Sequence, residues 1–267
     1  MLGIWSKSLG EQPVDKITSN QVLEWLLSRK DLQPEIIHNY HSCLSNFFNY
    51  CKRRKWLEDC PTDNISGNDL PTVPKKPKGV LTVDQATAMF ECLEGKYARF
   101  VAWFALQAFA GIRRTEAIRF RWDWLDFTHK RIVLPGWVFS TDAKPQRGTK
   151  SAEDWVMQGL PDNLWVWLEK YRQDRIRVQY PDPLTDMAIR RELAELTNHP
   201  INPWPHNALR HTFATMHIPL SESADKTALL MRHRSTRKLY QNYLAEIVPQ
   251  EEAQRYFNIV PQKPNSR

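Results

Sequence analysis

Residues 207–214 read Asn-Ala-Leu-Arg-His-Thr-Phe-Ala. Two cationic side chains, Arg210 and His211, stand at the head of this segment. An apolar pattern with helical spacing runs through it, formed by Leu209, Phe213 and Met216. The segment predicts a helix that begins with phosphate-binding side chains and is anchored by buried apolar ones.

A second segment, residues 111–117, reads Gly-Ile-Arg-Arg-Thr-Glu-Ala and follows a nearly continuous apolar run at 98–110. The apolar run predicts a buried central helix that ends at Gly111, and a new helix near Arg114. Arg113 would then stand at a helix start, where its guanidinium and free N–H groups can hold a phosphate. Together with Arg210 it could neutralise a pentacoordinate phosphoryl transition state, although each arginine alone is more often a surface ion-pair residue.

A third segment runs from Leu230-Met-Arg to His233, and Tyr243 follows ten residues after the histidine. A tyrosine that attacks phosphorus stores the bond energy as a phosphotyrosine, so the reaction needs no metal and no cofactor. Most tyrosines on amphipathic helices simply pack, and Tyr240, one turn earlier, is the rival nucleophile.

Composition limits the class of protein. The chain has 267 residues, 42 % hydrophobic residues, a net charge of +7 and a pI of about 9.2. This balance allows a sizeable core and favours a polyanionic partner, with simple solubility as the alternative. Its apolar runs are shorter than a membrane span, and the N-terminus lacks a signal-peptide pattern. Four cysteines without metal-ligand spacing indicate reduced thiols in a cytoplasmic protein and no metal site.

Helical patterns dominate the remaining chain. Residues 1–17 are predicted to be irregular, with Trp5 as an anchor. Helices are expected from Thr18 or Ser19, from Pro34, from the capping box at Thr82 to Gly95, and at about 162–178 (capped by Asp162), 184–197, 222–231, 235–244 and 249–257. Short β-prone pieces predict a small antiparallel sheet, namely Arg131–Leu134, Trp137–Phe139 and Trp155–Met157.

Taken in chain order, the three segments resemble the tyrosine recombinases, also called phage integrases. Residues 111–127 resemble the first motif of that family, G-x-R-x-x-E followed by a short strand. Residues 208–214 resemble the second, H-x-L-R-H-T-F-A. Residues 230–233 with Tyr243 resemble the third, L-G-H followed by a tyrosine nine or ten residues on. The resemblance covers about residues 12–260.

The resemblance implies a mainly α fold with a small antiparallel β-sheet. It divides the chain into an N-terminal helical, SAM-like DNA-binding domain (1–68), a basic proline-rich linker (69–80) and a catalytic domain (81–267). Two basic clusters could contact the DNA backbone: Lys52, Arg53 and Arg54 in the first domain, and Lys75, Lys76 and Lys78 in the linker. A solvated basic helix end is the commoner meaning of the first cluster. Only two clear helices are predicted before residue 68, so an N-terminal helix is expected to be missing or reduced.

The resemblance also implies a role for each matching residue. Arg113 and Arg210 would clamp the scissile phosphate, and His233 would bond it. Tyr243 would be the nucleophile, leaving a 3′-phosphotyrosine and a free 5′-hydroxyl. Lys150, with Lys144 as second choice, matches the family's lysine, the acid for the 5′-oxygen. Glu116 and His211 would support the site.

Two positions depart from the family pattern. Asn207 stands where a histidine is usual, and His206 precedes it by one residue. An amide cannot accept a proton as an imidazole does, so His206 could substitute, or Asn207 could simply cap the helix. Arg232 replaces the usual glycine before His233, adding bulk or a phosphate contact.

The implied function is site-specific DNA recombination or integration, by a mobile-element enzyme of the bacterial cytoplasm and nucleoid. Implied partners are double-stranded DNA with a recombination site, further protomers forming a tetramer on paired sites, and DNA-bending accessory proteins, with no membrane. The 249–257 helix would pack in a neighbouring protomer. Two alternatives stay open: a catalytically decayed integrase that only binds DNA, and a monomeric relaxing topoisomerase of the same chemistry.

Overall fold

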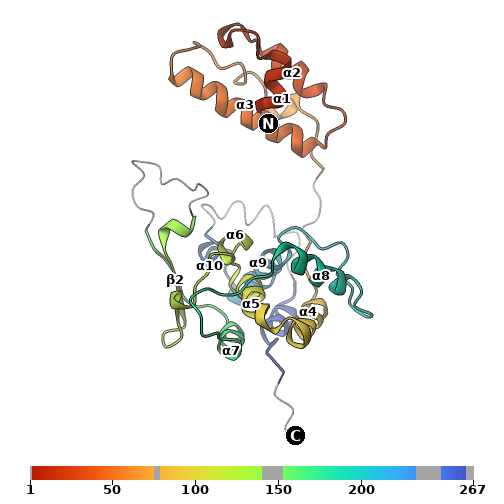
Figure 1. Cartoon of the computed structure of the whole chain (residues 1–267), viewed down its shortest axis with the longest axis vertical. Helices are drawn as coiled ribbons and strands as arrows, with labels where there is room; N and C mark the ends of the chain where they lie inside the picture. The colour runs from red at the N-terminus through yellow and green to blue at the C-terminus, as the bar shows by residue number, and fades with distance from the viewer. Residues whose placement is uncertain (1, 75–78, 140–152, 233–247, 263–267) are drawn as a thin grey trace. The chain divides into compact units, whose positions relative to one another are not determined.

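The computed structural model describes residues 2–74, 79–139, 153–232 and 248–262 (Figure 1). Their contacts divide the chain into two units, Met1–Lys76 and Pro77–Arg267, each with a hydrophobic core of its own. The described residues are mainly helical with a small antiparallel sheet, which confirms the predicted fold class.

Residues 2–74 form three helices, α1 (Leu2–Leu9), α2 (Ser19–Leu27) and α3 (Pro34–Arg53). The second unit contains, in chain order, α4 (Val83–Lys96), α5 (Val101–Ala110), α6 (Arg114–Ala117), β1 (Leu125–Asp126), β2 (Arg131–Leu134), β3 (Trp155–Met157), α7 (Asp162–Lys170), α8 (Pro183–Ala194), α9 (Ala208–Ser221), α10 (Ala224–Leu230) and α12 (Gln250–Phe257).

Helix α1 corrects the prediction that residues 1–17 are irregular and that the first unit has only two clear helices. Its Trp5 is buried, and the ring centroid lies 5.6 Å from those of both Phe47 and Phe48 on α3. An isolated helix of this length is marginal in water, so burial of the indole, rather than local propensity, stabilises it. The sequence pattern missed it because so short a segment gives little periodicity.

The predicted helix starts in this unit are confirmed. The Thr18 hydroxyl accepts the Gln21 N–H at 3.3 Å, and the Gln21 side chain accepts the Thr18 N–H at 2.9 Å. Pro34 lies in the first turn of α3. The packed core of this unit extends past residue 68, because Leu70 is buried in it.

Helix α5 is the centre of the second unit. All ten of its residues are buried, as the lack of a polar face predicts, and it packs against α7 and α9. Gly111 ends it in the left-handed conformation, with a φ of 63°. This prediction is confirmed, and it matters because Gly111 directly precedes the candidate arginine segment.

The sheet differs in one strand from its prediction. The order is β1-β2-β3, all antiparallel, with Ile132 opposite Leu125 on one side and opposite Met157 on the other. Residues 136–139 form a 3₁₀ turn instead of a strand. The Trp137 ring packs edge-on against Trp124 at 5.7 Å, so a tertiary contact overrides the β propensity.

Several helix ends also differ. Helix α4 continues through Gly95 to Lys96, and Tyr97 takes the C-cap position. Helix α7 ends at Lys170 rather than near residue 178. Asp162 is the first residue of α7 rather than its cap, and its carboxylate pairs with Lys130 at 2.6 Å.

Helix α12 packs within its own chain against α9 and α4. Tyr256 is completely buried, and its hydroxyl donates to the Ala108 carbonyl at 2.9 Å. In this structure of a single chain the helix packs in cis, and its packing in a neighbouring protomer stays a prediction.

Two kinds of feature are absent from the described residues. None of their helices is long and apolar enough to cross a membrane. None of their His, Cys, Asp and Glu side chains gather in groups that could hold a metal ion.

Candidate active site

The turn at Gly111 brings the first arginine segment against α9. A Cβ at this position would lie 2.5 Å from Phe213 Cδ1, so only glycine allows the backbone to approach this ring. The chain then extends through Ile112, and Arg113 becomes the residue preceding α6. The predicted position of Arg113 at a helix start is confirmed.

Glu116 fixes the orientation of Arg113. The Arg113 Nη1 atom donates to Glu116 Oε1 at 2.9 Å, and the Arg113 backbone N–H donates to Oε2 at 3.1 Å. The Glu116 side chain is 9 % exposed, whereas that of Arg113 is 40 % exposed. The buried carboxylate thus anchors a guanidinium whose remaining donors can reach a ligand.

Arg210 joins the three sequence segments. It lies in the first turn of α9 and is buried. Its Nη1 donates to the Gly111 carbonyl, and its Nη2 donates to the Met231 carbonyl at 2.5 Å. The structure therefore brings the predicted residues Arg113 and Arg210 into one site, together with the backbone that leads to Arg232.

Arg232 is a third guanidinium at this site, and the sequence assigned it no definite contact. Its Nη1 lies 3.5 Å from Glu116 Oε1, and its Cζ lies 5.7 Å from the Trp155 ring centroid. Burial lowers the pKa of Arg232, Glu116 opposes this, and the charge of Arg113 adds to the lowering. Its φ of 52° is in the left-handed region, which explains why the family pattern has glycine here.

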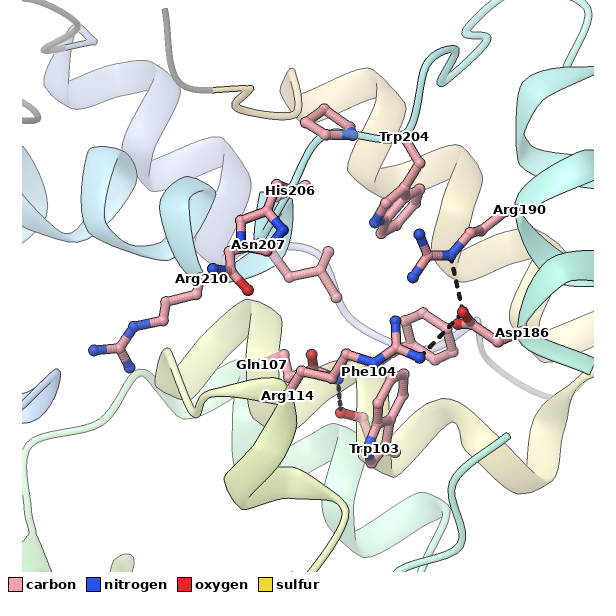
Figure 2. Close-up of a pocket in the computed structure, with 13 residues that line it drawn as sticks. Trp103, Phe104, Gln107, Arg114, Asp186, Arg190, Trp204, His206, Asn207 and Arg210 are labelled. Carbon is pink, nitrogen blue, oxygen red and sulfur yellow. Dashed lines mark hydrogen bonds and ion pairs between the residues drawn. The ribbon is translucent and has the colours of Figure 1, made fainter. Parts of the chain in front are cut away.

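A cavity of about 320 Å³ lies beside the start of α9 (Figure 2). Its wall contains an ion cluster in which Asp186 accepts from Arg114 at 3.2 Å and pairs with Arg190 at 3.0 Å. The cavity lining is partly aromatic, with Trp103, Phe104 and Trp204. Sequence reasoning missed this cluster because its members come from separate elements.

His206 and Asn207 are exposed residues of this cavity lining. In Figure 2 the Arg210 guanidinium points away from the cavity, on the side opposite Asp186 and Arg190. Asn207 precedes α9 with a φ of 52°, and its side chain forms no capping hydrogen bond. The prediction that Asn207 caps the helix is wrong, because an N-cap side chain reaches the first N–H groups from extended backbone.

The basic end of α3 is exposed, at Lys52, Arg53 and Arg54. Lys52 Nζ lies 3.8 Å from an Asp59 oxygen and 3.9 Å from an Asp63 oxygen, and Arg54 donates to the Tyr50 hydroxyl at 3.2 Å. These contacts are loose and solvent-exposed, so the cations could exchange them for phosphates.

Several predicted site residues lie outside the described residues. They are Lys75, Lys76 and Lys78 of the linker, Lys144 and Lys150, His233, Tyr240 and Tyr243.

Several solved structures resemble this chain, three of which follow. The Tn1549 transposon integrase in complex with transposon right end DNA has a TM-score of 0.70 and 15 % identity, over 95 % of this chain and 89 % of the other. A lambda integrase dimer bound to a COC′ core site has a TM-score of 0.58 and 13 % identity, over 86 % and 81 %. The XerH site-specific recombinase bound to palindromic difH substrate has a TM-score of 0.56 and 15 % identity, over 85 % and 69 %.

No protein-family model matches the sequence, and no curated protein matches it significantly. At identities of 13 % to 15 %, a likeness to solved structures concerns the course of the backbone. It extends over 85 % to 95 % of the chain. The chain therefore has the fold of the tyrosine recombinases and integrases.

Proposed function

We propose that the protein is a site-specific DNA recombinase that breaks and rejoins strands through a 3′-phosphotyrosine intermediate. The observation that carries the proposal is the buried Arg210, whose guanidinium bonds the carbonyls of Gly111 and Met231. These two bonds join the backbone that precedes Arg113 to the backbone that precedes Arg232. The fold neighbours, which are integrases and a recombinase in complexes with transposon-end, core-site and difH DNA, support recombination of DNA as the function.

The proposed reaction is a transesterification. The Tyr243 oxygen attacks phosphorus, its bond to phosphorus forms, and the bond from phosphorus to the 5′-oxygen breaks. Lys150 gives a proton to the leaving oxygen, and the tyrosyl proton goes to a base, a role that His206 would fill by turning its imidazole towards the arginines. Attack by a 5′-hydroxyl on the phosphotyrosine reverses these steps and rejoins a strand.

Arg113 and Arg210 would place positive charge where negative charge develops in the transition state. A phosphodiester carries one negative charge, and its pentacoordinate transition state carries more. Arg113 and Arg210 present fixed donors in a partly buried site, so little reorganisation is needed during the reaction. His233 would add a hydrogen bond to the same phosphate. Bond energy is conserved in the phosphotyrosine, so the scheme uses no cofactor.

The remaining partners follow from the same proposal. Lys52, Arg53 and Arg54 of the first unit and Lys75, Lys76 and Lys78 would bind the backbone of duplex DNA around the site. Strand exchange requires paired sites, so four protomers would assemble on two duplexes. Accessory proteins that bend DNA would assist where a site is long.

A DNA-binding protein without catalysis is the second candidate, favoured by Asn207 in place of histidine and Arg232 in place of glycine. A supercoiled plasmid carrying two candidate attachment sites separates the possibilities. The proposal predicts recombinant circles that require both sites. A ladder of topoisomers without site dependence would indicate a relaxing topoisomerase, and unchanged plasmid under conditions of demonstrated binding would indicate the decayed binder.

A further inference from the structure

One carboxylate serves two guanidinium groups in the candidate active site. Glu116 Oε1 lies 2.9 Å from Arg113 Nη1 and 3.5 Å from Arg232 Nη1. The Glu116 side chain is 9 % exposed, so its charge is poorly solvated and depends on these partners. A single negative charge cannot neutralise both guanidinium groups, so the three side chains together carry a net positive charge that attracts an anion.

The left-handed backbone conformation of Arg232 is unfavourable for a residue with a side chain. The residue follows the end of α10, its N–H donates to the Leu229 carbonyl at 3.0 Å, and its φ is 52°. Glycine is preferred at such helix ends, because a Cβ is strained in the left-handed conformation. Local strain of this kind persists where the surroundings require it, and it concentrates at functional sites.

The surroundings hold Arg232 in place beside Glu116. Its guanidinium lies over the Trp155 ring at 5.7 Å, and its side chain is 24 % exposed, compared with 40 % for Arg113. Arg113 is thus the more accessible of the two cations, and Arg232 is the one restrained by packing. If Arg113 turns its donors to a phosphate, Arg232 remains beside the same Glu116 oxygen.

This arrangement solves an electrostatic difficulty. A buried carboxylate without a compensating cation is strongly destabilised, so Glu116 alone would hold the full charge of Arg113. A second cation reduces that cost because the carboxylate stays compensated. We propose that Arg232 is a positioning residue: it remains paired with Glu116 and so releases the charge of Arg113 to the scissile phosphate. This proposal rests on the proposed recombinase function.

A double-mutant cycle on Arg232 and Glu116 tests the proposal. Cleavage rates of the full chain are measured on a nicked DNA substrate that traps the covalent product, for wild type, Arg232→Gly, Glu116→Gln and the double variant. DNA dissociation constants are measured in parallel. We expect Arg232→Gly to slow cleavage roughly 10- to 100-fold, with DNA affinity changed less than about twofold. The double variant should cleave within about threefold of Glu116→Gln alone, because the uncharged amide of that variant needs no cation.

Three further variants separate positioning from structural effects. Arg232→Lys keeps a cation and should retain most of the cleavage rate. Arg255→Ala removes a solvent-exposed partner of Asp84, 3.2 Å away, and should change nothing. Arg232→Gly relieves the left-handed strain, so urea unfolding should find it at least as stable as wild type. If it fails to fold, Arg232→Asn, which also tolerates this conformation, takes its place in the cycle.

The possible failures are distinguishable. Unchanged cleavage in Arg232→Gly overturns the inference and leaves the recombinase proposal intact. A further slowing by Arg232→Gly in the Glu116→Gln background, as large as in wild type, also overturns it, because Arg232 would then act independently of Glu116. A wild type that binds DNA but forms no covalent product removes the proposed function, and this inference with it.

Discussion

At the scale of single residues, Arg210 has two roles, and its substitution is expected to affect cleavage through one and stability through the other. Arg210→Ala removes a phosphate ligand and leaves the buried carbonyls of Gly111 and Met231 without this donor. We predict undetectable cleavage, near-normal DNA binding, and a loss of about 1–3 kcal/mol of unfolding free energy for each unsatisfied group. Urea unfolding and DNA titration check this. Equal loss of binding and cleavage, at unchanged stability, would contradict it.

His217 gives a prediction about pH. It is buried on α9, its Nδ1 lies 2.8 Å from the Thr227 hydroxyl, and burial lowers its pKa to about 4. In the unfolded chain the His217 imidazole binds a proton below about pH 6.5, whereas in the folded chain it stays neutral until the pH approaches 4. The contribution of His217 to stability is therefore complete above about pH 6.5 and is lost as the pH falls towards 4. We predict a decrease of up to about 3 kcal/mol in unfolding free energy over this window.

The matched control for that prediction is His217→Gln, which cannot titrate and should flatten the pH dependence. The pKa of Asp126 is lowered to about 2, and its titration changes stability only at pH values below the ordinary pKa of an aspartate. Measurements that stop at about pH 4.5 therefore exclude the contribution of Asp126. Equal slopes in the two proteins would show that His217 is not the group responsible. His41, whose pKa is also lowered, is present in both.

The sequence predicted Arg113, Glu116 and Arg210 as site residues, because each is a charged residue in the first turn of an expected helix or directly before it. It did not predict the pairing of Arg232 with Glu116, since a left-handed φ at an arginine leaves no mark in composition or periodicity. The same limit explains the error at Asn207. An asparagine before a helix usually caps it, but here the backbone is left-handed.

At the scale of elements, the turn between α5 and α6 positions the site. Gly111→Ala would introduce a Cβ 2.5 Å from Phe213 Cδ1 at a φ of 63°. We predict a loss of about 2–4 kcal/mol of unfolding free energy, with cleavage reduced because Arg113 moves.

Gly95→Ala is the control for that substitution. Gly95 lies in α4 with open space around the added Cβ, so alanine should stabilise the protein by about 0.5–1 kcal/mol. Urea unfolding of both variants gives the comparison. A Gly111→Ala protein as stable as wild type would mean that α9 does not pack this closely against the turn.

Elements were predictable where a local signal was strong. The capping boxes at Thr18 and Thr82, the proline at the start of α3 and the apolar length of α5 define helices without tertiary information. Elements were missed where packing decides. Helix α1 depends on the contacts of Trp5, and the turn at 136–139 depends on Trp124.

At the scale of the whole molecule, the two units have separate cores, and the chain between them is basic. Replacing Lys75, Lys76 and Lys78 by alanine should weaken binding to all DNA sequences. In a plot of log affinity against log salt concentration, the slope should become shallower by up to about 3. Each phosphate that is no longer neutralised reduces the size of this slope by about 0.9.

Lys96→Ala is the control, because this lysine pairs with Glu192 at 2.6 Å in the second unit and should leave the slope unchanged. Fluorescence titrations over a range of salt concentrations give both slopes. If the triple variant keeps the wild-type slope, these lysines do not contact the backbone.

Covalent trapping tests the central claim most directly. Wild type, Tyr243→Phe and Tyr240→Phe are incubated with nicked attachment-site DNA, and the products are separated on a denaturing gel. We predict a protein–DNA adduct with wild type and with Tyr240→Phe, and none with Tyr243→Phe. DNA binding by all three proteins, with no adduct from any of them, would contradict the recombinase account.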